Sequence, residues 1–534
     1  MDRPWWQDAV VYQIYPRSFA DSDGDGVGDL PGVISRLDYL SETLGIDAIW
    51  LSPFYPSPMT DFGYDVADYC DVDPLFGTLE DFDRLLAAAH DRGLRIIIDL
   101  VPNHTSDEHP WFIESRSSKD NPKRDWYVWS DPKPDGSPPN NWLSNFGGKA
   151  WEWDGETGQY FLHSFLASQP DLNWRNPEVR EAMFDVVRFW LDRGVDGFRI
   201  DVAHFIMKDP EMRDNPPAGA RDGAFKSLGE YDSQLHPYDK GHPDVHAVFR
   251  ELRTLLDSYP GDRFSVGEVH VFDMEEWALY YGQDLDELHM PFNFTLVWAP
   301  WSARRFGELI DQVESAVPDG GWPNHVLGNH DERRLVGRYG ARQARVAAML
   351  LLTLRGTPTL YYGDELGLAN VEIPRHLQQD PWALQEPAVE SRDGCRTPMP
   401  WDGTAAAGFS PTMVAPWLPI PDDHRSLNVE SQLGDDRSML RLYIELLRLR
   451  KSREVLRAGA YDPIGTADGV LAYRRQTGDE SLLIALNFTD EERVVRTGPG
   501  DVVLSSELDR DGPINQRLIL RPHEGVVMAT QVNP

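Results

Sequence analysis

The chain has 534 residues, with 87 Asp and Glu against 51 Lys and Arg, which gives a formal net charge of −36. This length exceeds one ordinary hydrophobic core and predicts two to four domains, or fewer if one of them is a large α/β barrel. The strong negative charge argues against phosphate backbones and anionic membrane surfaces, so we expect neither nucleic acid nor membrane as a partner.

The cysteines and the apolar segments bear on the cellular compartment. The sequence contains only Cys70 and Cys395, so no disulfide framework is expected. No uncharged apolar run reaches about 18 residues, and the N-terminus has no basic segment followed by an apolar one. We therefore expect a cytoplasmic protein.

Eight short β-rich segments that end in polar residues recur along the chain, with amphipathic helical patterns between them. The predicted strands span residues 9–19, 47–53, 95–104, 197–204, 263–270, 287–294, 325–331 and 357–365. Helical patterns at 78–93 and 177–194 precede the third and fourth strands, an alternation typical of a parallel sheet with helices outside. Eight such units favour a closed (β/α)8 TIM barrel, of the α/β class, over an open sheet. A barrel places its chemistry on the loops that follow the strands' carboxyl ends.

Segments without this alternation predict further domains. Residues 103–174 are rich in Pro, Gly, Asn and Trp and too long for a simple loop, which predicts a small inserted domain after the third strand. The barrel domain then comprises residues 1–102 and 175–457, with long loops at about 205–245 and 366–420 that should roof its mouth. From residue 458 to 534 strands alternate with tight turns, which predicts a C-terminal antiparallel β domain.

Three acids, Asp201, Glu268 and Asp331, each follow a different predicted strand. One such acid alone could equally be a helix N-cap, but three at one barrel mouth indicate a functional site. Arg199 lies two residues before Asp201, so both side chains share one face of the strand. Arg199 can therefore hold the Asp201 carboxylate ionised, as a nucleophile requires.

The motifs around these acids carry a family resemblance. "DLVPNH" (99–104), "GFRIDVAH" (197–204), "GEVH" (267–270) and "GNHD" (328–331) resemble the four signature regions of the α-amylase family of glycoside hydrolases, family 13. "QPDLNW" (169–174) resembles the fifth region, in the form typical of the oligo-1,6-glucosidase and α-glucosidase branch. "YQIYPRSFADSDGDGVGDL", "DFGYDVADY" and "SRDGCRTPMPWD" extend the resemblance over nearly the whole chain.

The resemblance implies roles for the residues at the barrel mouth. Asp201 would be the nucleophile, Glu268 the general acid/base and Asp331 the transition-state stabiliser, with His104 and His330 hydrogen-bonding to the sugar beside it. A retaining glycosidase needs an ionised carboxylate to attack the sugar and a protonated one, with a raised pKa, to protonate the departing oxygen. We therefore expect a raised pKa for Glu268.

Asp61 and Tyr64 in "DFGYD" resemble the pair that recognises a terminal non-reducing glucose, Asp61 through O4 and O6 and Tyr64 by stacking on the ring. We predict that Arg396 is the charged partner of Asp61, with Arg392 as the alternative. Such an ion pair would close the far end of the pocket. It predicts an exo-acting enzyme rather than one with an open cleft.

The stretch "DSDGDGVGD" has the spacing of the first part of an EF-hand calcium loop, with acids at positions 1, 3, 5 and 9 and a carbonyl at position 7. Position 12 is Gly32, so the bidentate Glu of that motif is missing. Resemblance to the branch implies a single structural Ca²⁺ here, with Mg²⁺ as the alternative ion; without a metal the stretch would be a solvated acidic turn. The predicted ligands are Asp21, Asp23, Asp25, Val27 and Asp29.

The sequence thus predicts a retaining, exo-acting α-glucosidase that hydrolyses the terminal non-reducing bond of short α-glucosides through a covalent glucosyl-enzyme. A transglucosylase or sucrose-acting enzyme, which transfers or isomerises a glucosyl group, shares every motif and is the alternative. We expect a small substrate such as maltose, isomaltose, sucrose or a short oligosaccharide, and a monomer or weak homo-oligomer. Val202, after the expected nucleophile, resembles the residue of branch members that accept α-1,6 bonds. A non-catalytic relative is a remote alternative. Such a protein should have lost the acids and should carry a membrane span, whereas this sequence keeps the three acids and has no apolar run of that length.

Overall fold

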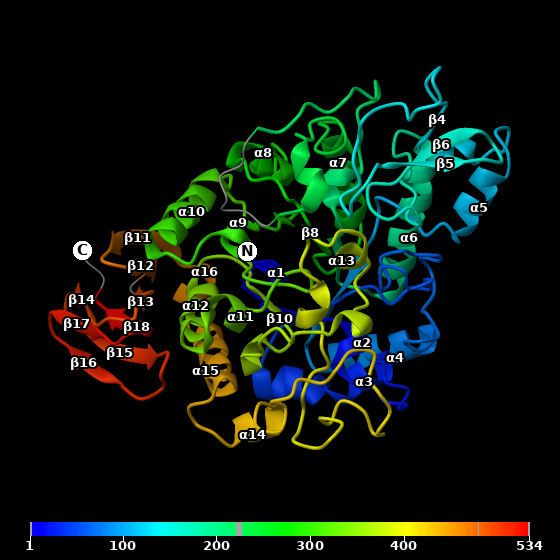
Figure 1. Ribbon diagram of the computed structural model, residues 1–534. Helices are drawn as coiled ribbons and strands as arrows, with labels where there is room; N and C mark the ends of the chain where they lie inside the picture. Colours follow the sequence, from blue (N-terminus) through cyan, green and yellow to red (C-terminus); the bar gives the residue numbers. More distant parts are fainter. Residues whose placement is uncertain (1–2, 220–226, 479, 532–534) are drawn as a thin grey trace.

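The computed structural model describes residues 3–219, 227–478 and 480–531. At its centre seven parallel strands follow the order β10-β1-β2-β3-β7-β8-β9 (Figure 1). These strands are β1 (Val11–Ile14), β2 (Ala48–Leu51), β3 (Arg95–Leu100), β7 (Gly197–Ile200), β8 (Phe264–Gly267), β9 (Met290–Pro291) and β10 (Thr359–Tyr361). Nearly all their residues are buried, as expected for strands that have a packed barrel interior on one face and helices on the other.

The barrel closes at residues 325–326, between β9 and β10. Two isolated parallel bridges join Asn293 to His325 and Val326 to Thr359. Since β10 also pairs in parallel with β1, the sheet returns to its starting strand. The predicted (β/α)8 barrel is therefore confirmed.

The strand predicted at 325–331 is not continuous. Beyond Val326 the chain passes through Gly328 and then turns, because the side-chain oxygen of Asn329 accepts the backbone N–H of Asp331 at 2.9 Å. The other strands are also shorter than predicted, and their polar ends belong to the loops of the barrel mouth.

A buried acid lies on the seam between the first and last strands. Glu365 follows β10, and its Oε1 accepts hydrogen bonds from the hydroxyls of Tyr12 on β1 at 2.7 Å and of Tyr39 at 2.9 Å. Burial raises the pKa of Glu365 to about 7, although the two tyrosine hydrogen bonds act to lower it. The seam between β1 and β10 therefore contains a carboxyl group that resists ionisation.

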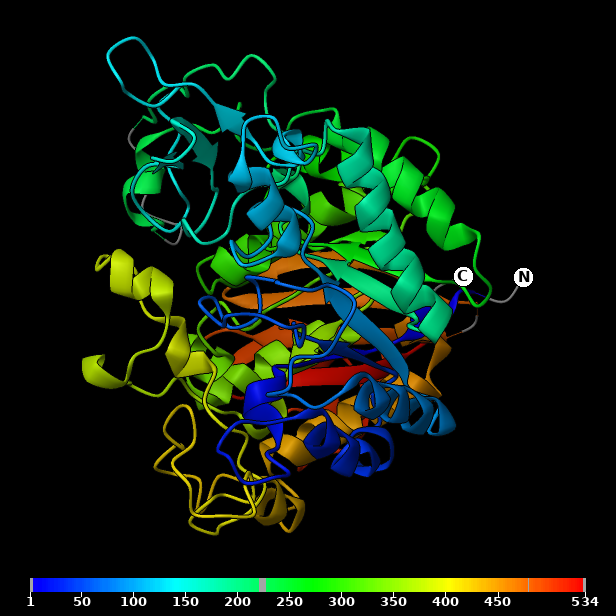
Figure 2. The ribbon, with the colours of Figure 1, turned by 90° about the vertical axis from the view of Figure 1, so that its right-hand side faces the viewer.

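Helices surround the barrel (Figure 2). The longer ones have clear start signals: Thr78 and Asp81 form a capping box at the start of α4, and Asn176 caps α6 with Pro177 in its first turn. The barrel helices and their extensions are α1 (Trp5–Asp8), α2 (Pro16–Phe19), α3 (Leu30–Ser35), α4 (Leu79–Asp91), α6 (Pro177–Arg193), α7 (Val245–Asp257), α8 (Met274–Ala278), α9 (Thr295–Trp298), α10 (Ala303–Ala316), α11 (Leu335–Tyr339), α12 (Ala341–Thr353), α13 (Pro381–Gln385), α14 (Val429–Leu433), α15 (Met439–Ser452) and α16 (Glu454–Ala458).

An inserted domain leaves the barrel after β3 and returns at α6. It contains α5 (Pro110–Ser117) and a three-stranded antiparallel sheet of order β4-β6-β5, formed by β4 (Trp129–Ser130), β5 (Trp151–Asp154) and β6 (Gln159–Leu162). An antiparallel bridge between His104 and Asp171 ties the two ends of the insertion together. The insertion projects above the barrel mouth (Figures 1 and 2).

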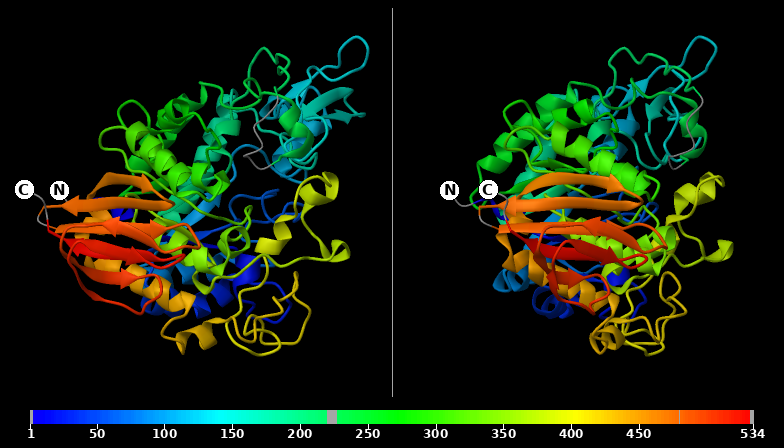
Figure 3. Two further views of the ribbon diagram at one scale, coloured as in Figure 1. Left: turned by 60° about the vertical axis from the view of Figure 1, so that its left-hand side comes forward. Right: turned by 90° about the vertical axis from the view of Figure 1, so that its left-hand side faces the viewer.

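The C-terminal domain is an antiparallel β structure on the opposite side of the barrel (Figure 3). One sheet has the order β11-β12-β13-β18-β15-β16, and β14 pairs separately with β17. The C-terminal domain packs on the barrel through Arg475, which donates to the carbonyl of Thr353 at 2.6 Å. The ring of Phe488 also stacks on Trp301, with ring centroids 4.2 Å apart. The strands are β11 (Ala460–Ala467), β12 (Val470–Thr477), β13 (Glu480–Asn487), β14 (Arg493–Arg496), β15 (Gly500–Ser505), β16 (Gly512–Ile514), β17 (Arg517–Leu520) and β18 (Gly525–Thr530).

Across the described residues, no helix combines the length and the apolar character needed to cross a membrane.

Candidate active site

The mouth of the barrel holds a pocket of about 400 Å³. Among the residues proposed from the sequence, those that line it are Asp61, Tyr64, His104, Asp201, Glu268, His330, Asp331 and Arg392. Arg199 and Arg396 lie beneath its surface, each with only 1% of its area exposed. The polar ends of several strands therefore meet in one cavity, as the barrel topology requires.

Arg199 links the carboxyl groups at the base of the pocket. Its Nη1 lies 2.7 Å from Asp201 and 2.6 Å from Asp99, and its Nη2 lies 2.6 Å from Glu268. Because Arg199 and Asp201 are two residues apart at the end of β7, both side chains point into the barrel mouth. One buried guanidinium thus brings Asp201 and Glu268 close together.

The pKa of Glu268 differs in direction from our expectation. Burial raises the pKa of Asp201 well above its usual range, and the nearby Glu268 carboxylate opposes the lowering effect of Arg199. Burial also acts to raise the pKa of Glu268, but Arg199 and then His270 lower it below its usual range. The direction for Glu268 is thus opposite to the raised pKa expected from its role, because Arg199 contacts both carboxyl groups of this closely coupled pair.

The backbone after Asp201 is strained. Val202 has φ of 35° and ψ of 46°, in the left-handed region that a β-branched residue rarely adopts. This conformation directs the Val202 N–H toward Glu268, whose Oε2 accepts it at 3.1 Å. The turn therefore helps to fix Glu268 relative to Asp201.

Asp331 lies on the other side of the pocket, held by two arginines. Its Oδ1 lies 3.1 Å from Arg392 and 2.8 Å from Arg396, and its Oδ2 lies 3.2 Å from Nε2 of His330. The side chain keeps 25% of its area exposed to the pocket. Asp331 is thus fixed in direction and still open to a ligand.

The two predicted histidines are buried and neutral. Burial lowers the pKa of His104 to about 4 and that of His330 to about 3. Nδ1 of His330 accepts from the amide of Gln13 at 2.8 Å, so Nε2 carries the proton and can donate to Asp331. His104 contacts the carbonyl oxygen of Tyr64 and the amide of Gln169 through its Nε2. Both rings can therefore act as neutral hydrogen-bonding groups.

The partner of Asp61 is Arg392, which was the alternative prediction. The prediction of Arg396 as the partner of Asp61 is wrong. Nη2 of Arg392 lies 3.1 Å from Oδ1 of Asp61, whereas Arg396 donates to Asp331 and to the carbonyl of His330. Arg396 lies one turn further along, and its guanidinium is buried below the pocket. Burial raises the pKa of Asp61 to about 6 against the lowering effect of Arg392.

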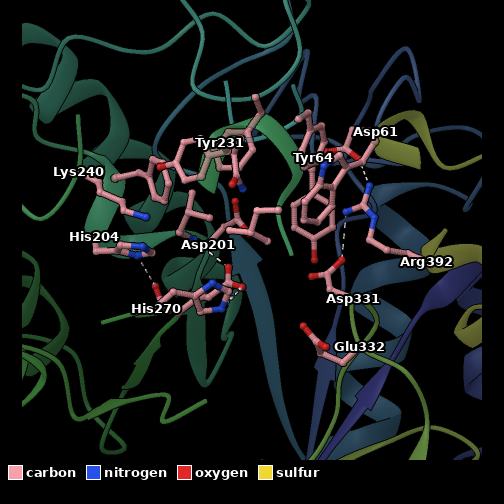
Figure 4. Close-up of a pocket in the computed structure, with 18 of the residues that line it drawn as sticks. Asp61, Tyr64, Asp201, His204, Tyr231, Lys240, His270, Asp331, Glu332 and Arg392 are labelled. Carbon is pink, nitrogen blue, oxygen red and sulfur yellow. Dashed lines mark hydrogen bonds and ion pairs between the residues drawn. The ribbon is translucent and has the colours of Figure 1, made fainter. Parts of the chain in front are cut away.

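Figure 4 shows this arrangement, with Asp61, Tyr64 and Arg392 on one side of Asp201. The ring of Tyr64 is parallel to that of His330, at 5.3 Å between centroids and an interplanar angle of 1°. The Tyr64 hydroxyl also hydrogen-bonds to Nε2 of His330 at 2.8 Å. These contacts fix Tyr64 as a wall of the pocket.

Sequence reasoning did not identify the opposite wall. There Lys240, His204, His270 and Tyr231 line the pocket (Figure 4). The ammonium of Lys240 lies 5.0 Å from the centre of the Tyr231 ring. The loop at 205–245 was expected to roof the mouth, but no motif marked individual residues in it. Residues 220–226 of that loop lie outside the described residues.

Two loops meet above the pocket. Phe146 of the inserted domain stacks on Trp382 of α13, with ring centroids 5.1 Å apart and planes at 14°. The guanidinium of Arg392 lies 5.1 Å from the Phe146 ring. The insertion and the loop at 366–420 therefore contact each other directly over Arg392.

The acidic loop near the N-terminus lies outside this pocket. Carboxylate oxygens of Asp21, Asp23 and Asp29 lie within 4.8 Å of one another, close enough to share a cation. Among the described residues Asp25 does not belong to this group, and its Oδ1 accepts the N–H of Val27 at 2.8 Å. Three of the predicted side chains therefore fit a hard cation with oxygen ligands.

Comparison with known families covers almost the whole chain. Residues 13–459 match the family described as "Alpha amylase, catalytic domain", and residues 464–527 match a domain of unknown function. A probable α-glucosidase of Rhizobium meliloti is 47% identical over 503 residues, 92% of this chain and 90% of that protein. An oligo-1,6-glucosidase of Parageobacillus thermoglucosidasius is 41% identical, over 95% of this chain and 94% of that protein.

Solved structures are similarly close. The crystal structure of an α-glucosyl transfer enzyme superposes with a TM-score of 0.94 at 45% identity, over 99% of this chain and all of that one. The trehalulose synthase of Pseudomonas mesoacidophila superposes with a TM-score of 0.90 at 37% identity, with the same coverage. These similar structures therefore include enzymes named for glucosyl transfer and for trehalulose synthesis.

Proposed function

Since the chain belongs to the α-amylase family of glycoside hydrolases, we propose that it is a retaining, exo-acting α-glucosidase that cleaves the terminal non-reducing bond of short α-glucosides. One observation carries this proposal: Asp201, Glu268 and Asp331 line a pocket in which Asp61 and Arg392 are paired. A pocket closed by that pair accommodates one glucose beyond the bond to be cleaved. Exo-cleavage follows from this geometry.

In the first step Asp201 attacks C1 of the glucosyl unit while Glu268 protonates the departing oxygen. In the second step Glu268 removes a proton from water, which attacks C1 and releases Asp201. Both steps pass through a transition state like an oxocarbenium ion, and retention of configuration results. The bridging of both carboxyls by Arg199 supports the short separation, about 5 to 5.5 Å, that this route needs.

The first step requires the proton on Glu268, whose pKa Arg199 holds below its usual range. A substrate oxygen that draws Glu268 away from Arg199 removes the main influence that lowers its pKa. Arg199 then keeps its contacts with Asp201 and Asp99. We propose that substrate entry raises the pKa of Glu268 in this way.

Asp331 accepts hydrogen bonds from O2 and O3 of the glucosyl ring, and these strengthen as the ring flattens. Arg392, Arg396 and His330 keep its carboxylate in place for this role. Asp61 accepts from O4 and O6, and Tyr64 stacks on the ring. The ring is thus bound on both sides of the reacting carbon.

Glucosyl transfer to a sugar is the second candidate function. It is favoured by the overall similarity to an α-glucosyl transfer enzyme and by the aromatic lining opposite Asp61. Phe205 and Tyr231 offer rings against which an acceptor sugar can pack in place of water. The two functions share the glucosyl-enzyme and differ in what attacks it.

The substrate is a small carbohydrate, and we propose maltose, isomaltose, sucrose or a short oligosaccharide. We also propose a monomer or weak homo-oligomer in the cytoplasm. The free thiols of Cys70 and Cys395 support a reducing compartment.

A structural cation is proposed for the acidic loop, with Ca²⁺ preferred and Mg²⁺ as the alternative. Asp21, Asp23 and Asp29 would hold it through carboxylate oxygens, and Val27 through its carbonyl. The bound ion would supply positive charge that cross-links the loop. It would take no part in glycoside cleavage.

Product analysis by chromatography tests the proposal. The enzyme is incubated separately with maltose, isomaltose, sucrose and maltotetraose, each at low and high concentration. Hydrolysis to monosaccharides at every concentration supports the α-glucosidase and ranks the linkages, and glucose as the first product of maltotetraose supports exo-cleavage. New oligosaccharides or a sucrose isomer would favour the transfer function, and no product from any α-glucoside would contradict both.

A further inference from the structure

Asp380 is a buried carboxylate that no sequence motif marked. It has no exposed area and lies in the loop that begins after β10, directly before α13. Its Oδ1 lies 2.7 Å from Nη2 and 3.0 Å from Nε of Arg392. Asp380 therefore binds one edge of the guanidinium that faces the pocket.

This contact with Asp380 determines the orientation of the rest of the Arg392 guanidinium. Nη1 of Arg392 reaches Asp331 at 3.1 Å, and Nη2 is shared with Asp61, also at 3.1 Å. The bonds to Asp380 are the shorter ones, as expected for a charge-assisted contact on the Nε edge. Arg392 thus bridges the two acids at a fixed distance.

Asp380 is itself held by backbone groups. Its Oδ2 accepts the N–H of Arg392 at 2.8 Å, and its Oδ1 accepts the N–H of Trp382, which caps α13. Its own N–H donates to Asp393. The carboxylate thus has little freedom to follow Arg392 if the guanidinium turns.

We propose that Asp380 is a positioning residue for the glucose subsite, because it holds Arg392 in the orientation that bridges Asp61 and Asp331. This inference rests on the proposed function, since it assigns Asp61 and Asp331 to the terminal glucose. Without Asp380 one guanidinium would face only two carboxylates and could turn fully onto them. Asp331 would then be drawn away from O2 and O3, and Asp61 from O4 and O6.

Two variants separate this role from the capping of α13. Asp380→Asn keeps the size of the side chain, and Asp380→Ser keeps a strong N-cap, while both remove the carboxylate. Asp364→Asn is the matched control, because Asp364 is a buried acid near Arg334 in the same region, outside the pocket lining. Folding of each variant is checked by far-UV circular dichroism and thermal unfolding.

The assay compares 4-nitrophenyl α-glucoside with its 6-deoxy analogue, which lacks one hydroxyl assigned to Asp61. We expect both Asp380 variants to lose on the order of 10- to 100-fold in kcat/KM for the glucoside, as for a displaced catalytic contact. The preference of the wild-type enzyme for the glucoside over the analogue should shrink toward 1. The control variant should keep both values.

Equal losses on both substrates, or unchanged kinetics, would overturn the inference, since a merely structural residue does not alter discrimination at O6. Failure of both variants to fold where the control folds would also overturn it. The proposed function fails separately, if the wild-type enzyme cleaves neither substrate.

Discussion

Glu365, at the seam between β1 and β10, provides a direct test of how burial of a carboxyl group changes the pH dependence of the free energy of unfolding. In the folded protein burial raises its pKa to about 7, against 4.5 for an unperturbed Glu. Between these values the folded state binds a proton that the unfolded state has released. Stability therefore falls as pH rises through this window, by roughly 3 kcal/mol at about 1.4 kcal/mol per pKa unit.

Glu365→Gln removes this titration and keeps an oxygen for the Tyr12 and Tyr39 hydroxyls. The free energy of unfolding of the variant relative to wild type should increase by about 3 kcal/mol from pH 4 to pH 8. The difference between the two proteins cancels the other buried acids, which both retain.

Equilibrium urea unfolding followed by tryptophan fluorescence, at several pH values in this range, measures the effect. Thermal unfolding at the same pH values gives an independent ranking. Parallel pH profiles for the two proteins would show that Glu365 ionises normally inside the fold, and would refute the argument from burial.

Three further predictions concern the site and the acidic loop. Asp201→Ala should remove nearly all turnover while circular dichroism stays unchanged, and more than a few per cent of residual rate would contradict its role as nucleophile. Arg392→Gln should raise the pKa of Asp61 above about 6, because Arg392 is the strongest lowering influence on it. Since ionised Asp61 is the form that accepts hydrogen bonds from glucose, the acid limb of the pH profile of kcat/KM should move to higher pH. An unmoved limb would contradict the effect of Arg392 on Asp61. EDTA should lower the unfolding temperature of the wild-type protein, since an ion at about 100 times its Kd contributes about 2.7 kcal/mol to the free energy of unfolding. The unfolding temperature of Asp21→Asn should not respond to EDTA. No response of the wild-type protein to EDTA or added Ca²⁺ would contradict the metal site.

The positions of Asp201 and Glu268 could be predicted because these acids directly follow the buried strands β7 and β8, whereas Asp331 lies five residues beyond the last bridge at Val326. An apolar run defines a strand, and the strand's carboxyl end defines the mouth. The period of two along a strand also placed Arg199 and Asp201 together. These inferences needed only local sequence and the topology of a parallel barrel.

The partner of Asp61 could not be chosen in this way. Arg392 and Arg396 are four residues apart, at the start and just after the end of a single 3-10 turn (Arg392–Cys395) that no sequence pattern predicted. The choice depends on Asp380, which lies in a Pro-rich loop with no pattern of its own. Long-range ion pairs between loops leave little trace in a single sequence.

The direction of the pKa shift of Glu268 was also beyond local reasoning. A sequence shows that Arg199 can reach Asp201, but not that the same guanidinium reaches Glu268 at 2.6 Å. The balance between burial and a shared cation depends on distances of a few tenths of an ångström. Those distances come only from the packed barrel.

The seventh strand position of the barrel, at residues 325–331, affects the thermal stability of the protein. Within the described part of the chain, two bridges join the segment that carries Asp331 to the sheet. Beyond them side chains hold it: Arg338 donates to the carbonyl of Leu327, and Arg396 to that of His330. Local opening there costs fewer backbone hydrogen bonds than unravelling of β2 or β3. Gentle warming should therefore inactivate the enzyme while most of the barrel is still folded, so variants that anchor this segment more firmly should keep activity to higher temperature.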